Sequence, residues 1–502
     1  MRSRPAQFAA TIVLAVLYIA LRCWHLTDSC LWFDEIFGVH AAQHPWGEMF
    51  GFVALDLIHP PLFYVLLKLW VAIGGESLLW LRSFPVVFAV AALFPFLSLC
   101  RELKLDPQTR MFALFLITVN GSLIKYSQEV RMYSLLMCLS LFSIWLFTRY
   151  FIKGKSFVPL LIVNILLVYT HYFGWFLIVT EVAAILLLQR IKWRAMIKMF
   201  AITLAAFLPW LLVIYNASRT GVTVAQNIGW MQRPGMAAIS LLKLALIEPF
   251  YFQASNVDPF SIYRVTIPLI LIFLVAIILF ATAWSERSVK EVRSVFLLLS
   301  FTVIPVLGAL VFSWTLPYSV WGARHLIFVF APSSLLFAIV IFNIPNRSIR
   351  TAALTLILLF SGYALVLQSG RQTSQYAWCA WEPLVAQIDQ TQPIKILAFE
   401  DLVAYHLWFA TRNNPAVTVF KVEGVDGVNE DKAYFLPRGF DGVERKDLKD
   451  LPASEYWLAL RVSEWDLNQP PLTSLSENGF RFGTPKIFPS EFSKQVLVDA
   501  MR

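Results

Sequence analysis

Two adjacent acids, Asp34 and Glu35, lie inside an aromatic run at residues 32–37. Aromatic neighbours remove water from a carboxylate, which makes the carboxylate more basic and lets it accept a proton from a hydroxyl. Asp34 and Glu35 are therefore candidate catalytic residues, one of them acting as a general base. The alternative is that both acids only stabilise the positive N-terminal end of a helix.

His59 directly precedes the pair Pro60-Pro61. Two consecutive prolines restrict the backbone to a rigid turn, so the histidine before them is held in a defined place. The imidazole could donate a hydrogen bond to an anion, or it could only cap the turn. The sequence does not distinguish these two roles.

A polar segment between two apolar runs holds Lys125, Tyr126, Glu129 and Arg131. Ion pairing, and extension of the long side chains towards water, explain part of this cluster. They do not explain Arg131, which lies next to the start of an apolar run. Arginine is suited to contacting a phosphate through two parallel hydrogen bonds, so this segment is a candidate phosphate-binding site.

His171 and the pair Arg324-His325 also lie between apolar runs. Each signal is weak alone. If all these segments face one side of a membrane, cations, histidines and carboxylates are gathered there. That composition suits an anionic, membrane-bound substrate and an acid–base step. The candidate residues for binding the anionic part of such a substrate are His59, Lys125, Tyr126, Glu129, Arg131, His171, Arg324 and His325.

Long apolar runs must position these residues. Hydrophobic residues make up 58% of the chain and charged residues only 15%. Runs of roughly 20 apolar residues match the hydrocarbon thickness of a bilayer, and the alternating pattern of a membrane barrel is absent. The sequence predicts a polytopic α-helical membrane protein with about eleven transmembrane helices. They are expected near 7–24, 83–100, 111–124, 132–148, 157–170, 172–188, 199–215, 263–283, 294–313, 325–342 and 351–368.

The charges of the loops predict the orientation of the chain. Every second loop is short and basic, and such loops face the cytoplasm. The N-terminus is then cytoplasmic, and the tail is extracytoplasmic, as are the long loops 25–82 and 216–262. Residues 60–75 are expected to form a helix at the outer interface. The basic loops contain Arg2, Arg101, Arg149, Arg190, Lys192, Arg287 and Arg347.

The chain is expected to consist of a transmembrane domain, 1–370, and a small extracytoplasmic α/β domain, 371–502. In the tail, apolar segments beginning at Lys395, Val417 and Tyr456 read as buried strands, and 400–411 reads as a helix. No phosphate-binding glycine-rich loop is found there.

The net charge of +9 does not indicate a nucleic-acid partner, because the cations form short clusters between apolar runs and not a stripe on a soluble domain. The five cysteines include no metal-ligand spacing. Cys23 and Cys30 could form a disulfide in an oxidising compartment, or both could be isolated thiols.

The ordered set of motifs resembles the GT-C class of membrane glycosyltransferases that use polyprenyl-phosphate sugars. The nearest group is the bacterial family related to protein O-mannosyltransferases and to the lipid A aminoarabinose transferase. His59 stands where the aminoarabinose enzymes often have lysine. The resemblance rests on Trp32-Phe-Asp34-Glu35, His59-Pro60-Pro61-Leu-Phe-Tyr64, Leu81-Arg82-Ser-Phe-Pro85, Tyr126-Ser-Gln-Glu-Val-Arg131-Met-Tyr133, Thr170-His171-Tyr172-Phe-Gly-Trp175 and Arg324-His325.

The resemblance implies a multi-pass protein of the inner membrane. Its donor would be a polyprenyl-phosphate-linked sugar, and its acceptor a lipid, a glycan or a protein on the outer face. It also implies inversion at the anomeric carbon, with the loop aspartate, Asp34, as the catalytic base. No cofactor is predicted; metal use varies in the class, and no ligand spacing here requires a divalent ion.

Two other functions also explain many helices and outward cations. A transporter or flippase of lipid-linked sugars would usually carry charges near the middle of its helices, where Glu181 is the main example here. An O-antigen ligase or polymerase also acts on lipid-linked glycans, but the early Asp34-Glu35 loop argues against it.

Overall fold

The computed structural model describes residues 4–188, 193–250, 263–282, 289–369, 377–388, 392–428, 436–438, 440–489 and 494–502. Several features singled out above lie outside these ranges. They are the basic residues Arg2, Arg190, Lys192 and Arg287, and the segment 251–262 of the expected outer loop 216–262.

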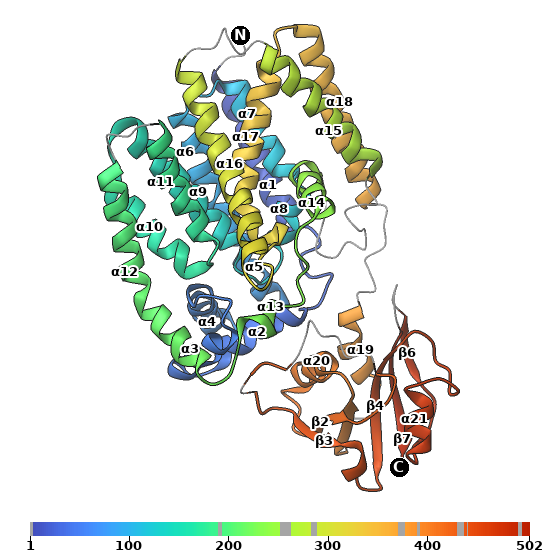
Figure 1. The fold of residues 1–502 in the computed structure, drawn as a ribbon. Coiled ribbons are helices and arrows are strands. Elements are labelled where there is room, and N and C mark those ends of the chain that lie inside the picture. Colours follow the sequence, from blue (N-terminus) through green and yellow to red (C-terminus); the bar gives the residue numbers. More distant parts are fainter. Residues whose placement is uncertain are drawn as a thin grey trace. The chain divides into compact units, whose positions relative to one another are not determined.

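The contacts within the chain divide it into two units (Figure 1). The helical unit comprises Met1–Thr27 and Leu57–Gln372, and the sheet unit comprises Asp28–Asp56 and Thr373–Arg502. Residues 28–56, which the sequence analysis placed in the transmembrane domain, therefore pack with the C-terminal segment. This division separates the two candidate acids from all the other candidate residues.

The helical unit is a bundle in which α9 has a central position. It contacts α5, α6, α10, α11 and the 3-10 helix η4, while α7 packs on α17 and α1. The helices of this unit are α1 (Arg4–Cys23), α4 (Leu62–Gly74), α5 (Leu78–Ala91), α6 (Leu93–Glu102), α7 (Pro107–Val119), α8 (Gly121–Ser127), α9 (Tyr133–Lys153), α10 (Phe157–Thr170), α11 (Gly174–Leu188), α12 (Trp193–Ser218), α13 (Val224–Ile228), α14 (Met236–Ile247), α15 (Tyr263–Thr282), α16 (Val289–Thr315), η4 (Ala323–Val329), α17 (Phe330–Phe342) and α18 (Arg347–Ser369).

Each predicted transmembrane segment falls on a helix, but the predicted number of spans is not confirmed. Among the described residues, seven helices are long and apolar enough to cross a membrane. Helices α1, α10 and α11 are apolar but shorter, and the expected span 111–124 is interrupted at Asn120 between α7 and α8. The seven are Leu78–Glu102, Tyr133–Lys153, Trp193–Ser218, Tyr263–Thr282, Val292–Thr315, Ala323–Phe342 and Arg347–Ser369.

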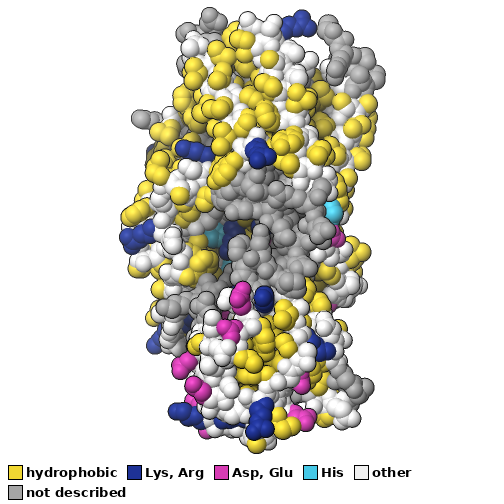
Figure 2. All heavy atoms as spheres, turned by 90° about the vertical axis from the view of Figure 1, so that its right-hand side faces the viewer, with side chains coloured by type: hydrophobic (Ala, Val, Ile, Leu, Met, Phe, Trp, Pro, Cys, Tyr) yellow, Lys and Arg dark blue, Asp and Glu magenta, His cyan; other side chains and the backbone are white. Residues whose placement is uncertain are grey.

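The surface of the helical unit is that of a protein in contact with lipid. In the face shown in Figure 2, hydrophobic side chains cover most of this unit and charged side chains are few. Large side chains such as Leu212, Ile278 and Leu359 are more than half exposed. On the sheet unit in the same view, acidic and basic side chains are interspersed, as on a soluble protein.

Local sequence explains where several of the helices begin. Helix α7 starts after Asp106, whose carboxylate accepts hydrogen bonds from the backbone N–H groups of Gln108 (2.9 Å) and Thr109 (3.1 Å). Pro107 occupies the first helical position, where its missing N–H costs no intrahelical bond. This turn is one of the basic connections, after Arg101, that were expected in the cytoplasm.

The sheet unit contains a seven-stranded sheet in the order β3-β2-β1-β4-β7-β5, with β6 also paired to β7. Strands β1 to β4 are parallel, and β7 runs antiparallel to β4. The strands are β1 (Ile394–Ala398), β2 (Val417–Glu423), β3 (Glu444–Asp447), β4 (Glu455–Val462), β5 (Arg481–Phe482), β6 (Lys486–Pro489) and β7 (Lys494–Met501). The helices are α2 (Phe33–Gln43), α3 (Trp46–Asp56), η5 (Ala377–Ala380), α19 (Trp381–Val385), α20 (Asp401–Thr411), η6 (Leu448–Asp450) and α21 (Leu472–Glu477).

Helix α20 forms the crossover that parallel strands β1 and β2 require, and it packs against both. The predicted strands and the predicted helix 400–411 correspond to β1, β2, β4 and α20. On one face of the sheet, Leu458 and Val498 pack with Leu475 of α21 in a buried core. The small α/β fold expected for the tail is thus confirmed.

One disulfide joins the two sequence segments of the sheet unit. Cys30 is bonded to Cys379, while Cys23 is a free, exposed thiol. The considered pairing of Cys23 with Cys30 is therefore wrong. Sequence proximity suggested it, whereas the actual partner is 349 residues away and comes close only through the packing of the sheet unit.

Candidate functional site

Four helix ends of the helical unit bring Arg131 and three histidines together. A guanidinium nitrogen of Arg131 lies 3.0 Å from Nε2 of His59. The ring of His59 is 6.3 Å from that of His171, and His171 is 5.3 Å from His325. His59 precedes α4, Arg131 precedes α9, His171 joins α10 to α11, and His325 lies in η4.

Further candidates extend this group. The ring of Tyr133, at the start of α9, is 6.3 Å from His325 and 5.1 Å from Tyr126, and the guanidinium of Arg324 lies 6.0 Å from the centre of the Tyr133 ring. The ammonium of Lys125 lies 5.8 Å from the ring of Tyr126. We call His59, Arg131, His171, Arg324 and His325 the cation–histidine cluster.

The hydrogen bonds assign the ring protons of the histidines. A guanidinium can only donate, so Nε2 of His59 must accept from Arg131 and the proton of this ring is on Nδ1. Nδ1 of His171 accepts from the backbone N–H of Phe173 at 3.1 Å, which places its ring proton on Nε2. His59 and His171 are therefore neutral donors, each through one nitrogen.

The cluster carries positive charge, and its side chains of His59, Arg131 and His171 are buried, whereas Arg324 and His325 are partly exposed. Arg131 is 2% exposed and His171 4%. Burial lowers the pKa of His171 well below its usual range, and the neighbouring His325, His59, Arg131 and Arg324 lower this pKa further. The two guanidinium groups, of which that of Arg131 is buried, therefore supply the positive charge while His171 stays neutral, and such a positive group is suited to an anion.

A network of buried arginines holds the turn before Arg131. Arg82 is fully buried and donates to the backbone carbonyl of Gln128 at 2.6 Å. The side-chain amide of Gln128 donates to the carbonyl of Trp24, and Arg22 donates to the carbonyls of Ile117 (2.9 Å) and Thr118 (3.3 Å). Sequence reasoning did not assign a role to Arg22, Arg82 or Gln128. The available signal was the presence of arginines inside apolar runs, where they need partners.

Asp34 and Glu35 occupy the first turn of α2 in the sheet unit, and their environments differ. Glu35 is fully buried, and its carboxylate accepts a hydrogen bond from the backbone N–H of Trp32 at 3.1 Å. It thereby satisfies a donor at the helix start that α2 itself cannot satisfy. Asp34 is partly exposed. Of the two acids, Asp34 has the carboxylate that solvent or a substrate can reach.

The candidate residues are thus distributed over both units. His59, Lys125, Tyr126, Arg131, His171, Arg324 and His325 are linked by the contacts given above within the helical unit. Glu129 is buried in the same turn as Arg131, whose N–H donates to the Glu129 carbonyl at 2.6 Å. Asp34 and Glu35 belong to the sheet unit.

Glu181, the main intramembrane acid, has hydrogen-bond partners. Its two carboxylate oxygens accept from the hydroxyl of Ser143 (2.6 Å) and from the amide of Asn164 (2.7 Å). This cluster links α9, α10 and α11 inside the bundle. Within the described residues, no group of three or more His, Cys, Asp or Glu side chains is arranged to hold a metal ion.

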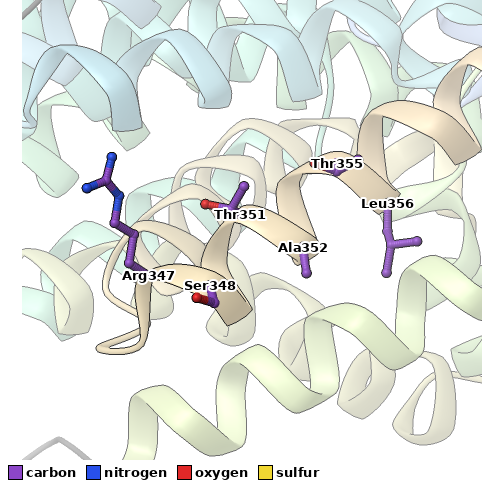
Figure 3. A pocket seen from close by; sticks show the side chains of 6 residues that line it. All are labelled: Arg347, Ser348, Thr351, Ala352, Thr355 and Leu356. Carbon is purple, nitrogen blue, oxygen red and sulfur yellow. The ribbon is translucent and has the colours of Figure 1, made fainter.

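A shallow pocket of about 650 Å³ lies away from the cation–histidine cluster. All the side chains in Figure 3 come from the N-terminal part of α18. None of the candidate residues lines it. The lining residues are Arg347, Ser348, Thr351, Ala352, Thr355 and Leu356.

No family model and no curated protein sequence matches the chain. Several solved structures match the chain. ArnT from Cupriavidus metallidurans in complex with undecaprenyl phosphate matches with a TM-score of 0.58 and 10% identity, over 99% of this chain and 98% of that chain. Its apo structure matches with a TM-score of 0.59 and 11% identity, over 98% of both chains.

The chain has the fold of ArnT. This match confirms the predicted GT-C fold over nearly the whole length of both chains, including the sheet unit. The oligosaccharyltransferase of Archaeoglobus fulgidus, in a complex with Zn and sulfate, matches less closely. Its TM-score is 0.49 with 14% identity, over 80% of this chain and 61% of that chain.

Proposed function

We propose that this protein is a glycosyltransferase that moves a sugar from a polyprenyl-phosphate donor to a lipid, glycan or protein acceptor. The observation that carries this proposal is the cation–histidine cluster, because the buried positive charge of Arg131 next to the neutral His171 fits a phosphate. The ArnT fold supports the choice of a lipid phosphate, since the ArnT structure was solved with undecaprenyl phosphate.

In the proposed reaction, an acceptor hydroxyl attacks the anomeric carbon as the bond from that carbon to the phosphate oxygen breaks. Negative charge grows on the departing lipid phosphate. Arg131 and Arg324 stabilise this charge more strongly in the transition state than in the ground state, which lowers the barrier. Asp34 accepts the proton of the hydroxyl, and the anomeric configuration inverts. Neutral His59 and His171 contribute hydrogen bonds to phosphate oxygens.

The choice of Asp34 as the base follows from the difference between the two acids. Glu35 is buried and its carboxylate accepts from a backbone N–H, whereas Asp34 is partly exposed on the same helix turn. Adjacent positions on a helix point in different directions, so one acid can serve the helix and the other the substrate.

We propose that the sheet unit is extracytoplasmic and that the N-terminus is cytoplasmic, in the inner membrane. The basic loops support this orientation, and so does the Cys30–Cys379 disulfide, because disulfides persist in oxidising compartments. In intact cells, and in a Cys23→Ser background that removes the free, exposed thiol of α1, an impermeant thiol reagent should label Glu477→Cys, on the exposed surface of the sheet unit, and not Lys153→Cys. The reverse pattern would refute the orientation.

Transfer activity is the direct test of the proposed function. The purified protein in lipid nanodiscs would be given undecaprenyl-phosphate-linked, radiolabelled hexoses and pentoses together with cell-envelope lipids and proteins. We expect label to move from the donor to an acceptor in the parent, and not in Asp34→Asn. Movement of intact donor across the bilayer of proteoliposomes, with no transfer of label, would instead identify a flippase.

A further inference from the structure

Helix α2, which carries Asp34, is attached to the C-terminal segment at its beginning. The disulfide from Cys30 to Cys379 lies just before the helix, and the backbone N–H of Cys30 also donates to the sulfur of Cys379 at 3.0 Å. The chain segment that leads into Phe33 is therefore tied covalently to η5, which comes after all the helices of the helical unit in the sequence.

A second attachment lies beyond Asp34 on the same helix. Nδ1 of His40 is 2.9 Å from the hydroxyl of Tyr405 in α20. Burial, together with His44 and Arg412, lowers the pKa of His40 to about 3, so its ring is neutral at physiological pH. A neutral imidazole can accept the Tyr405 hydroxyl proton at Nδ1 and keep its own proton on Nε2.

Aromatic rings pack around this hydrogen bond. Trp408 of α20 lies 4.6 Å from the ring of His40, and Phe440 lies 4.6 Å from Trp408 and 5.1 Å from His40. At the start of α2, Phe33 packs against Tyr405 at 5.3 Å. Ring pairs at these separations prefer particular relative orientations, so they restrict rotation of α2 as well as its distance from α20.

The second flank of α2 is covered by α3. Phe52 lies 4.9 Å from Phe37 and 4.9 Å from His40. Helix α2 is thus enclosed by α3 and α20, and it is fixed at Cys30 before Asp34 and at His40 after it. Such an arrangement defines the direction of a side chain on the helix more strictly than a loop does.

We propose that the C-terminal segment of the sheet unit is a positioning device for Asp34, with Tyr405 and the Cys30–Cys379 pair as positioning residues. This inference rests on the proposed role of Asp34 as the base. A general base works only within hydrogen-bond reach of the proton that it accepts, and an error of about 1 Å can cost roughly 100-fold in rate. The attachments act on the chemical step, whereas donor binding depends on the helical unit.

The test uses the full-length protein in nanodiscs, with Cys30→Ser/Cys379→Ser and Tyr405→Phe as variants. We expect kcat with an undecaprenyl-phosphate sugar to fall by about 10- to 100-fold in the double variant and by several-fold in Tyr405→Phe. KM for the donor and the Kd for undecaprenyl phosphate should stay at the parent values. A loss of folded protein would also lower the apparent kcat without changing KM, so kcat is expressed per binding-competent protein, counted by titration with undecaprenyl phosphate. A fall in kcat that disappears on this scale would contradict the proposal.

Two control variants match these changes. Cys23→Ser removes a free thiol of the helical unit, and Tyr456→Phe removes a tyrosine hydroxyl hydrogen bond of the sheet unit, to the carbonyl of Pro452 at 2.9 Å. Both should keep the parent kcat. If Tyr456→Phe lowers kcat as much as Tyr405→Phe does, the effect is general loosening of the unit, and the proposal is wrong.

A measurement without mutation covers the case in which the double variant fails to fold. Mild reduction of the parent should accelerate amide hydrogen exchange in α2 and leave exchange in β4 unchanged, with a parallel, reversible fall in kcat. Unchanged exchange in α2, or unchanged kcat after complete reduction, would overturn the inference. If instead Asp34→Asn turns over at the parent rate, the proposed base is wrong whatever the attachments do.

Discussion

The cation–histidine cluster and helix α2 hold their charged side chains in place in two different ways. The cluster gathers side chains from several helix ends, and the turn beside it is held by the hydrogen bond from Arg82 to the backbone carbonyl of Gln128. Helix α2 carries its two acids on one short element, which a disulfide and side-chain rings hold. One site is fixed by the backbone of a large bundle, the other by a few side-chain contacts.

The difference follows from what each site is proposed to do. A phosphate-binding site needs positive charge in a buried place, where each electrostatic interaction is strong, and the burial of Arg131 meets this need. A general base must exchange a proton with a substrate, so Asp34 must stay partly exposed. The bundle can therefore bury Arg131, whereas α2 buries Glu35 and leaves Asp34 accessible.

The largest effect is expected for Asp34→Asn. Asparagine keeps the size and most of the hydrogen bonding but cannot accept the proton, so turnover should fall by about 10²–10⁴-fold. The Kd for undecaprenyl phosphate should stay unchanged, because Asp34 has no proposed phosphate contact. Radiolabel transfer and equilibrium binding on the same preparation measure both quantities. If Asp34→Asn folds and keeps the turnover of the parent, Asp34 is not the base, and helix α2 is not a second site beside the cation–histidine cluster.

A smaller loss, and one of binding, is expected for Arg131→Ala. A charge-assisted hydrogen bond contributes about 1.5–3 kcal/mol, which corresponds to roughly a 10- to 150-fold weaker affinity for undecaprenyl phosphate. Arg131→Lys keeps the charge and should recover part of this loss, since an ammonium cannot make two parallel contacts. Parent affinity in Arg131→Ala would show that this arginine is only structural.

Lys125→Ala should have a milder effect than Arg131→Ala. Its ammonium is partly exposed, and exposed charge pairs contribute about 0.2–1 kcal/mol, that is, up to roughly fivefold in affinity. Added salt should weaken this contribution while leaving that of the buried Arg131 largely intact. Titrations of undecaprenyl phosphate at low and high ionic strength would measure this contrast, and equal salt dependence for both variants would contradict it.

The smallest effect on turnover is expected for Glu35→Gln, the matched control for Asp34→Asn. The amide oxygen of glutamine can still accept from Trp32, so a charge-assisted bond becomes a neutral one at a cost of about 1 kcal/mol in stability. Thermal unfolding should register this loss while kcat stays close to the parent. If Glu35→Gln is inactive while Asp34→Asn is active, Glu35 and not Asp34 is the general base.

Much of the helical unit could be predicted from the sequence because apolar runs are local signals. The fold class, the positions of the long apolar helices and the grouping of cations between apolar runs all depend on patterns within one or two helical lengths. Arg131, His171 and His325 were identified because each interrupts such a pattern at a helix end. Periodicity carries no information on distances between helices, so the contact of His59 with Arg131 had to come from the structure.

In the sheet unit, local sequence patterns predict individual strands but not the packing between segments that are far apart in the sequence. Strands β1, β2 and β4 were found from their apolar runs, but the packing of residues 28–56 with the C-terminal segment left no local trace. His40 and Tyr405 meet only because the chain returns after the whole helical unit. The sequence offered only a pairing of Cys23 with Cys30 or two isolated thiols as interpretations, and Cys379 is the residue bonded to Cys30.

The 349 residues between Cys30 and Cys379 also impose an order on the biogenesis of the protein. Translation proceeds at about 5–20 residues per second, so roughly 20–70 s separate the synthesis of the two cysteines. During that interval the ribosome produces the part of the helical unit from Leu57 to Gln372, while the nascent α2 still lacks α20 and the strands that complete its unit. Helix α2 is therefore made early, but the unit to which it belongs is completed last, and a chain that ends before Cys379 lacks the disulfide partner of Cys30.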